Sequence, residues 1–530
     1  MVRKIFQTNA ELKDWLSEQN SAIIFIPTMG GLHPGHQYLI QKAKERKTNT
    51  NQIILVSIFV NPLQFSKGED FKKYPRNINR DAELAFSAGA DAIWAPDYDE
   101  VFPGGEDSHF KIEVPKTLHN QLCGAERKGH FDGVATVIIR LIKIIQPKKL
   151  ILGEKDWQQL IIIRKLFQEL SIPVKIESYS TQRDQNGFAY SSRNSYLSDS
   201  ERVNAQSLPN AIKEAKTEFD KRKVINLTKI ASIFKENNLK IEYLKIVDPF
   251  SLKETENINR LCLLAVAVKC GSTRLIDHTF LMQRKPIIAI DGPAGAGKST
   301  VTKAFAKKLG FIYLDTGAMY RAVTWLIISN SIDPNDQAEI KNILQDSKLE
   351  FKTSSFVEQK IFINNIDVTE KIRSPKVTSM VSEIAKQQFV RELLTRKQKV
   401  IGNNGGLVAE GRDIGTAVFP DAEVKIFLTA SPTERAKRRA LDLNKRGYEF
   451  SSIEDLEKEI KERDKKDSER KIAPLKKAQD AIELVTDGMN IEDVLKELID
   501  IFRSKIPEEV WPTPNPVSYT HLTLPTIYSV

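Results

Sequence analysis

The sequence is poor in cysteine and has no long apolar run. Its three cysteines, Cys123, Cys262 and Cys270, are far apart and lack CxxC spacing. They indicate neither a disulfide framework nor a zinc site, so a reducing compartment is expected. No apolar stretch approaches the ~18 residues of a transmembrane helix, and residues 1–10 lack the apolar segment of a secretory signal. We therefore expect a cytoplasmic protein.

The end of the sequence has no charge. Residues 511–530 contain no Asp, Glu, Lys or Arg but four prolines, whereas charged residues make up 28% of the chain. Such a segment has little to pack with. We predict that residues 509–530 form a tail outside the folded domains, either disordered or an artefact of cloning or assembly.

The chain is basic, with a formal net charge of +10. This charge suits a protein that binds nucleic acid, a membrane surface or small anions, although a lysine-rich solvated surface explains most such chains. The notable basic residues here stand within phosphate-binding motifs, and no RNA-binding aromatic pattern or basic stripe occurs. The sequence therefore favours small nucleotides as partners and predicts neither nucleic acid nor membrane binding.

Apolar runs alternate with helical patterns in the first part of the chain. A predicted helix spans residues 36–46, and buried-strand patterns lie at 22–26, 53–60, 90–94 and 150–152. Strands that alternate with helices are typical of a parallel, doubly wound sheet. We predict an α/β, Rossmann-like domain over residues 1–190, followed by a small α+β subdomain over residues 191–282.

A second α/β pattern begins after the polar break at Gln283–Pro286. A buried strand at 287–290 follows directly, and no internal repeat relates the two halves. We predict that the second domain spans residues 283–508.

A phosphate-binding loop follows that strand. Residues 292–300, Gly-Pro-Ala-Gly-Ala-Gly-Lys-Ser-Thr, match GxxxxGK[ST] before a predicted helix at 300–309. Glycines let backbone N–H groups wrap phosphates, and the helix N-terminus adds positive potential. Lys298 suits the β- and γ-phosphates of ATP, and the Ser299 hydroxyl suits Mg²⁺. The predicted ATP-binding residues are Gly292, Gly295, Gly297, Lys298, Ser299 and Thr300.

Three further segments narrow the assignment of this half. Asp315–Arg321 and Val408–Asp413 each follow a predicted strand. Residues 462–470 place three side chains on one helical face at positions i, i+4 and i+7, namely Arg463, Asp467 and Arg470. Such an array is usually a solvated helix, but beside a P-loop it suits a mobile lid that carries arginines to the transferring phosphoryl group.

Together these motifs resemble the cytidylate kinases over about residues 286–506. The resemblance implies a P-loop nucleoside monophosphate kinase that transfers a phosphoryl group from ATP to CMP or dCMP, with Lys298, Arg463 and Arg470 as catalytic residues. Arginines suit the phosphate of CMP by bidentate geometry. Thr316 stands where the family usually has serine, so the hydroxyl is kept. The implied CMP-binding residues are Thr316, Arg321, Ser382, Arg391, Arg412, Asp413 and Asp467.

The first half carries an HxGH motif, His33-Pro-Gly-His36, between its first predicted strand and a helix. Two histidines three residues apart at a helix start can bind nucleotide phosphates. A metal site and purely structural histidines are the alternatives. A metal site needs a third ligand, and none stands at motif spacing.

Three polar segments accompany this motif. Ser57–Phe65 carries Gln64, Gly153–Gln159 follows another strand, and Phe188–Asn194 supplies hydroxyls and an arginine. Because the first two lie beyond the carboxyl ends of predicted parallel strands, they suit a ligand crevice.

Over roughly residues 4–281 the chain resembles the pantoate–β-alanine ligases, which are HxGH nucleotidyltransferases. That resemblance implies adenylation of pantoate by ATP with release of pyrophosphate, after which β-alanine displaces AMP. It implies that His36 donates a proton, that Lys155 stabilises charge on the triphosphate, and that Gln64 and Gln159 hold pantoate. The implied ATP-binding residues are Met29, Gly30, His33, His36, Gly153, Glu154, Lys155, Asp156, Tyr190, Ser191, Ser192 and Arg193.

The ligase resemblance has three further implications. Asp156 is expected to help hold Mg²⁺, as Ser299 is in the second half. Residues 123–133 are expected to cover the site as a loop, with Arg127 and His130 as weaker candidates. The family also suggests a homodimer through the first half.

Taken together, the motifs predict a fusion of two ATP-dependent enzymes that act on pantoate, β-alanine and CMP. One alternative keeps both folds but changes the substrates, joining another HxGH transferase to a UMP or dCMP kinase. A second alternative is a nucleotide-regulated nucleic-acid-binding protein that uses the +10 charge. Turnover of CMP and pantoate would exclude the latter.

Overall fold

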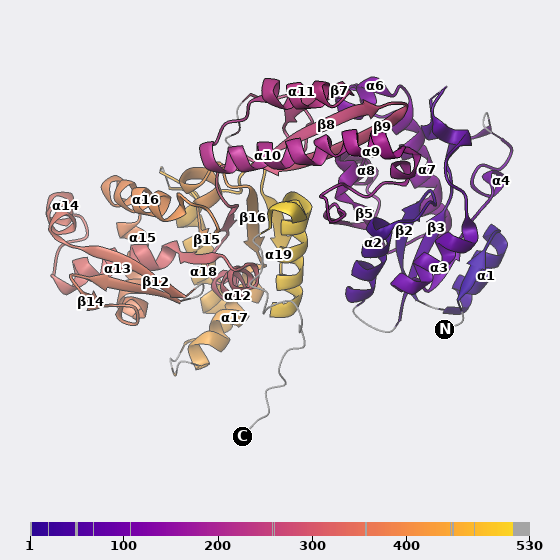
Figure 1. Ribbon diagram of the computed structural model, residues 1–530. Helices are drawn as coiled ribbons and strands as arrows, with labels where there is room; N and C mark the ends of the chain where they lie inside the picture. The colour runs from indigo at the N-terminus through magenta and orange to yellow at the C-terminus, as the bar shows by residue number, and fades with distance from the viewer. Residues whose placement is uncertain are drawn as a thin grey trace. The chain divides into compact units, whose positions relative to one another are not determined.

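The computed structural model describes residues 3–19, 21–47, 51–66, 68–105, 108–256, 258, 260–355, 358–445, 447, 450–470 and 472–511 (Figure 1). It divides into two compact units. The first contains Met1–Gln283 together with Pro507–Val510, and the second contains Arg284–Ile506 and Trp511. Residues 512–530, most of the predicted tail, lie outside the described part. Glu509 and Val510, which were predicted to belong to that tail, instead pack with the first unit, and Trp511 belongs to the second.

The first unit is built on a six-stranded parallel sheet in the order β1-β4-β3-β2-β5-β6. Its central strands are continuous apolar runs and are buried, as expected for a sheet covered by helices on both faces. The strands are β1 (Lys4–Phe6), β2 (Ala22–Thr28), β3 (Gln52–Ile58), β4 (Ala92–Trp94), β5 (Lys149–Gly153) and β6 (Lys175–Tyr179).

Helices and short turns connect these strands. They are α1 (Asn9–Gln19), α2 (Pro34–Glu45), η1 (Pro62–Gln64), η2 (Asp70–Lys72), α3 (Ile78–Ala88), α4 (Tyr98–Val101), α5 (Lys116–His119), α6 (Leu122–Glu126), α7 (His130–Ile145), η4 (Glu154–Asp156), α8 (Trp157–Glu169) and η5 (Ser192–Tyr196).

A small antiparallel sheet completes the first unit. Strands β7 (Leu239–Val247), β8 (Cys262–Cys270) and β9 (Thr273–Leu281) pair in chain order. The helices α10 (Ser207–Arg222) and α11 (Leu227–Glu236) pack against it (Figure 1). The remaining elements are α9 (Asp199–Ala205) and η8 (Glu508–Val510).

The second unit has a five-stranded parallel sheet in the order β11-β15-β10-β16-β17. β10 is the buried strand that leads into the P-loop, and it lies at the centre of the sheet. The strands are β10 (Ile287–Asp291), β11 (Ile312–Asp315), β15 (Leu407–Gly411), β16 (Val424–Thr429) and β17 (Ile482–Val485).

Helices and a second, antiparallel sheet surround these strands. The sheet consists of β12 (Leu349–Ser355), β13 (Glu358–Ile363) and β14 (Ile366–Asp367). The helices and turns are α12 (Lys298–Leu309), α13 (Thr316–Ser329), α14 (Gln337–Asp346), η6 (Lys371–Arg373), α15 (Pro375–Ile384), α16 (Gln388–Gly402), η7 (Ile414–Val418), α17 (Pro432–Lys445), α18 (Ile453–Ser468) and α19 (Ile491–Lys505).

The predicted α/β class with parallel sheets is confirmed in both units. Two local predictions were wrong. The segment 123–133, expected to be a loop, contains most of α6 and the start of α7. The helix expected to carry Arg470 ends at Ser468, so the three predicted lid residues do not share one continuous helical face.

Candidate active sites

The first candidate site lies where three neighbouring strands of the six-stranded sheet end. The HxGH turn follows β2, Gln64 follows β3, and Lys155 follows β5. Because β3, β2 and β5 are adjacent and parallel, their carboxyl ends bring these segments to one edge of the sheet. The structure thus places together three segments that lie far apart in the sequence.

The HxGH turn is fixed by a carboxylate that the sequence analysis did not single out. Asp81, buried on α3, accepts hydrogen bonds from the backbone N–H groups of Gly31 at 2.9 Å and Leu32 at 2.8 Å. Nothing in the local sequence marks this residue, because its partners are backbone groups of a distant turn. The turn leads into α2, where His33 is the residue before the first turn of the helix.

The two histidines of the motif face one another and have unused nitrogen atoms. The ring centroids of His33 and His36 are 4.0 Å apart, and Tyr190 stacks near His33 at 6.2 Å. The Nδ1 atoms of both histidines are buried and have no hydrogen-bond partner among the described residues.

Both histidines are neutral at pH 7 in the ligand-free site. Burial, followed by the charges of His36 and Lys155, lowers the pKa of His33 to about 2. Burial and Lys155 lower the pKa of His36 to about 4. A neutral imidazole still carries one N–H donor, so each ring can donate a hydrogen bond to a phosphate oxygen.

The Ser191–Arg193 segment lies beside the HxGH turn, although it comes from far along the chain. Ser192 Oγ donates to Gly31 O at 3.3 Å, and Ser191 accepts from the N–H of Arg193 at the start of η5. The Arg193 guanidinium forms two hydrogen bonds of 2.9 Å with Asp70. The ion pair holds this cation at the edge of the site.

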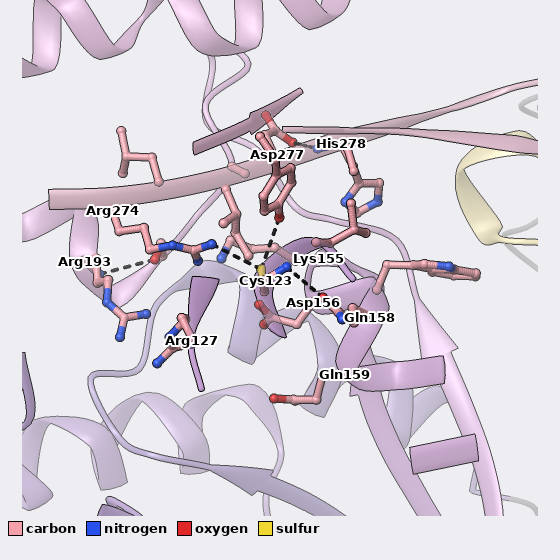
Figure 2. Close-up of a pocket in the computed structure, with 18 of the residues that line it drawn as sticks. Cys123, Arg127, Lys155, Asp156, Gln158, Gln159, Arg193, Arg274, Asp277 and His278 are labelled. Atoms are coloured by element: carbon pink, nitrogen blue, oxygen red, sulfur yellow. Dashed lines mark hydrogen bonds between the residues drawn. The ribbon is translucent and has the colours of Figure 1, made fainter. Parts of the chain in front are cut away.

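A pocket with an empty volume of about 910 Å³ joins the sheet edge to the small antiparallel sheet. Figure 2 shows Lys155, Asp156, Gln159 and Arg193 around it, with Arg274 entering from β9. Asp156 is exposed to the pocket. The surrounding protein raises its pKa by desolvation, but Lys155 and Arg193 outweigh that effect and lower it. The pocket therefore combines the ionised Asp156 carboxylate with several cations.

Arg274 is a pocket residue to which the sequence analysis gave no role. It forms an ion pair of 2.6 Å with Glu242. It also donates to Cys123 Sγ at 3.4 Å (Figure 2), and the Tyr243 hydroxyl lies 3.1 Å from the same sulfur atom. In the sequence, Arg274 is only a residue near the start of a strand of the small sheet. Its place in the pocket depends on how the two sheets pack, which the sequence does not reveal.

Gln64 is buried and makes contacts on both its side chain and its backbone. Its side-chain amide donates to Met29 Sδ at 2.8 Å and accepts from Asn61 at 3.2 Å. His130 donates to the Gln64 carbonyl at 2.8 Å, and Arg127 pairs with Glu69. Arg127 and His130, the weaker candidates from the sequence, therefore support the turn that carries Gln64 and also line the pocket.

The second candidate site surrounds the P-loop. Gly292 has a φ of +152°, and a Cβ there would meet Leu428 O at 2.0 Å, so only glycine fits. Lys298 Nζ donates to Gly292 O at 2.8 Å and to Pro293 O at 2.7 Å. Burial and the charge of Arg412 lower the pKa of Lys298. Ser299 and Thr300 are exposed at the start of α12.

Glu410, at the end of β15, is a site residue that the sequence analysis missed. It is buried, and its Oε1 accepts from Ser299 Oγ at 2.6 Å and from the Tyr313 hydroxyl at 2.8 Å. Its Oε2 is buried without a hydrogen-bond partner in the described part of the chain. Burial, followed by Asp315, raises the pKa of Glu410 to about 7. The sequence feature that could have identified Glu410 is an acidic residue at the end of a predicted buried strand, in the segment Val408–Asp413.

Most of the residues predicted to bind CMP lie around the same edge of the sheet. Thr316 Oγ1 donates to the Glu410 carbonyl at 2.7 Å. Arg391 forms an ion pair with Asp413, and both side chains are buried. Ser382 is half-buried on α15. Arg321, which was also predicted to bind CMP, forms an ion pair of 2.9 Å with Asp315.

Asp467 forms ion pairs with two arginines, one predicted to bind CMP and one predicted to belong to the lid. Its buried carboxylate pairs with Arg412 at 3.1 Å and also with Arg470, which follows the end of α18. Arg463 is half-buried, and burial together with Arg412 lowers its pKa to about 10, so it stays charged at pH 7. The arrangement concentrates positive charge near the P-loop, where Arg412 also donates to Gly292 O at 3.0 Å.

Among the described residues, no group of three or more His, Cys, Asp and Glu side chains forms a metal-binding cluster. In the same part of the chain, every helix is too short or too polar to cross a membrane.

Known sequences resemble both halves. The model of the Pantoate-beta-alanine ligase family matches residues 4–280, and that of the Cytidylate kinase family matches residues 288–504. A "Bifunctional pantoate ligase/cytidylate kinase" of Prochlorococcus marinus strain NATL1A is 98% identical over 515 residues, which cover 97% of this chain and all of the relative. The protein of the same name from strain SARG is 58% identical, over 96% of this chain and 99% of the relative.

Among solved structures, the pantothenate synthetase of Thermus thermophilus is 36% identical. It aligns with 52% of this chain and 98% of its own chain, with a TM-score of 0.48.

Proposed function

The chain belongs to the bifunctional pantoate ligase/cytidylate kinase family, and on that premise we propose the reactions and residue roles of its two sites. It is an enzyme with a ligase half and a kinase half. The ligase half condenses pantoate with β-alanine through pantoyl adenylate and releases pyrophosphate and AMP. The kinase half phosphorylates CMP and dCMP with ATP.

In the ligase half, the carboxylate of pantoate attacks the α-phosphorus of ATP, and the bond to pyrophosphate breaks. Negative charge then builds on the leaving group. His33 and His36 donate hydrogen bonds to the phosphates, and the Lys155 cation with the Ser191–Arg193 segment neutralises the developing charge. The amine of β-alanine next attacks the acyl carbon, and AMP leaves.

The positions of the other ligase residues suit binding. Gln64 and Gln159 hold pantoate, and their amides match its hydroxyl and carboxylate groups. Nine residues complete the adenosine and phosphate site, namely Met29, Gly30, Gly153, Glu154, Asp156, Tyr190, Ser191, Ser192 and Arg193.

In the kinase half, the P-loop backbone and Lys298 hold the phosphates of ATP. Lys298 exchanges its two backbone carbonyl partners for phosphate oxygens when ATP is bound. Arg463 and Arg470 stabilise the transferring phosphoryl group, and Arg321, Arg391 and Arg412 hold the phosphate of CMP. Asp413 and Ser382 meet its sugar and base, Thr316 supplies a hydroxyl, and Asp467 orients the arginines.

The donor atoms of both sites fit Mg²⁺. In the kinase half, the Ser299 hydroxyl at the start of α12 donates a hydrogen bond to Oε1 of Glu410. Oε2 of Glu410 has no hydrogen-bond partner in the described part of the chain. In the ligase half, Asp156 offers an ionised carboxylate toward the pocket. Oxygen donors of this kind suit Mg²⁺, which supplies charge neutralisation of the polyphosphate when bound.

We also propose that the protein is cytoplasmic and forms a homodimer through its ligase half. All three cysteines are free and buried, which suits a reducing compartment. Analytical ultracentrifugation measures the assembly. A monomer at micromolar concentration would contradict the dimer.

The observation that carries the proposal is the convergence of His33, His36 and Lys155 at adjacent strand ends, together with a complete P-loop in the other unit. Two assays on the purified chain test it. AMP release must require both pantoate and β-alanine, and ADP formation must require CMP or dCMP in preference to UMP. AMP release without pantoate, or equal rates with UMP, would contradict the proposed substrates.

A further inference from the structure

Four residues that follow the kinase half in sequence belong to the ligase unit. Pro507–Val510 come after α19, yet they pack with the first unit, and Val510 lies against its hydrophobic core. Glu508 and Glu509 lie within this segment, in the turn η8. Both carboxylates make specific hydrogen bonds rather than pointing into solvent.

Glu508 contacts the turn that carries the proposed ATP-binding residues. Its backbone N–H donates to both carboxylate oxygens of Glu154 at 3.1 Å. Its side chain accepts from the backbone N–H of Ser180 at 2.8 Å and from the Tyr38 hydroxyl at 3.5 Å. Glu154 is buried and directly precedes Lys155. Glu508 thus helps to satisfy a buried carboxylate one residue away from a proposed catalytic cation.

Glu509 contacts β9, a strand that lines the same pocket. Thr279 Oγ1 donates to its carboxylate at 2.5 Å, and the N–H of Phe280 donates at 3.3 Å. Thr279 directly follows Asp277 and His278, which line the pocket. The segment therefore fixes two walls of the ligase pocket from outside it.

We propose that Glu508 and Glu509 are positioning residues of the ligase site, so the segment after the kinase half is a working part of the ligase. This inference rests on the proposed ligase function. Removal of the two side chains takes an acceptor from the backbone N–H groups of Ser180 and Phe280, whereas the Glu508 N–H that donates to Glu154 is kept. Backbone N–H groups that lose their partners must move toward water or accept an unpaired state. Either response moves the end of β9 and the end of β6, which pairs with β5 just before Lys155, and adenylation depends on the geometry of these strand ends.

The test uses full-length variants with both activities measured on each preparation. We expect Glu509→Ala, alone or with Glu508→Ala, to lower kcat for pantothenate formation about tenfold or more, as loss of buried hydrogen bonds predicts. CMP phosphorylation should stay within about twofold of wild type, because the hydrogen bonds described above are made with the ligase unit. Glu509→Gln should retain most ligase activity, since its amide oxygen can accept the same two hydrogen bonds.

Two controls separate positioning from loss of folding. Glu492→Ala removes an exposed glutamate from α19 and should leave both activities unchanged. Thr279→Val removes the donor on the ligase side and should reproduce the loss seen in Glu509→Ala. AMP formed in a single turnover counts the competent sites, so kcat can be stated per folded molecule.

Unchanged ligase kcat per competent site in the Glu508→Ala/Glu509→Ala double variant would overturn the inference, and so would a loss explained entirely by fewer folded molecules. If wild type itself released no AMP in the presence of pantoate and β-alanine, the proposed function would fail instead. The two failures are therefore distinguishable.

Discussion

Buried carboxylates with raised pKa values stand next to the reactive groups of both sites. Glu154 precedes Lys155, and burial raises its pKa to about 7. Glu410 contacts Ser299, and its pKa is also raised to about 7. Burial penalises the ionised form of each carboxylate, and a nearby cation would favour that form.

Substitution of Glu410 should separate stability from activity. A folded-state pKa above the ordinary 4.5 means that the contribution of Glu410 to stability is complete below about pH 4.5 and is lost as the pH rises through about 7. Glu410→Gln carries no charge, so the melting temperature of its kinase unit should exceed that of wild type at about pH 8 but not at about pH 5. Its kcat should fall about tenfold or more if the carboxylate supports Mg²⁺.

Thermal unfolding at both pH values, with kinase assays over a Mg²⁺ titration, checks this. A variant that is less stable than wild type at the higher pH would show that the ionised carboxylate is fully compensated in the fold.

His36 provides the corresponding test in the ligase half. His36→Ala removes a proposed donor to the phosphates, so ATP–pyrophosphate exchange dependent on pantoate should fall by at least about 10²-fold. Because burial and Lys155 lower the pKa of His36 to about 4, the wild-type rate should not show a limb near pH 6.5 from this residue in the free enzyme. Undiminished exchange in the variant would remove His36 from the mechanism.

At this scale, motif residues were predictable and their partners were not. His33, His36 and Lys298 stand in short patterns whose spacing follows from a strand, a turn and a helix start. Asp81 and Glu410 act through contacts with residues 49 to 111 positions away. No local pattern encodes such contacts, because they depend on which strands become neighbours.

At the scale of elements, strands with continuous apolar runs were predictable, whereas exposed or short strands were not. β2, β3 and β10 are buried on both faces and therefore stand out in the sequence. The β12–β14 sheet and the three-residue β1 lack such runs. Helix ends were least predictable, as the end of α18 at Ser468 shows.

The end of α18 is also where Asp467 holds Arg412 and Arg470. Asp467→Asn removes a buried charge between two guanidinium groups, leaving them partly uncompensated. We expect the free energy of unfolding of the kinase unit to fall by about 3 kcal/mol. We also expect KM for CMP to rise by about tenfold, because the arginines lose their fixed orientation.

Denaturant unfolding and steady-state kinetics of the same variant measure both effects. A rise in KM without any loss of stability would mean that Asp467 contacts CMP rather than positioning the arginines. No change in either quantity would remove Asp467 from the site.

At the scale of the whole molecule, two complete folds share one chain and each has its own phosphate-binding machinery. The division near residue 283 was predictable from the polar break and the new strand after it. The membership of Pro507–Val510 in the first unit was not predictable. Sequence patterns divide a chain into consecutive segments and do not show that a late segment packs with an earlier domain. The first unit thus includes residues that follow the kinase half in the chain.

The central claim is that one chain holds two chemically separate active sites. The most direct measurement is Lys298→Ala in the full-length protein, assayed for both reactions in one preparation. CMP phosphorylation should fall by about 10²–10³-fold, since the cation that meets the phosphates is gone. Pantothenate formation should stay within about twofold of wild type, because Lys298 donates its hydrogen bonds to its own P-loop. Loss of both activities in a folded protein would contradict two separate sites.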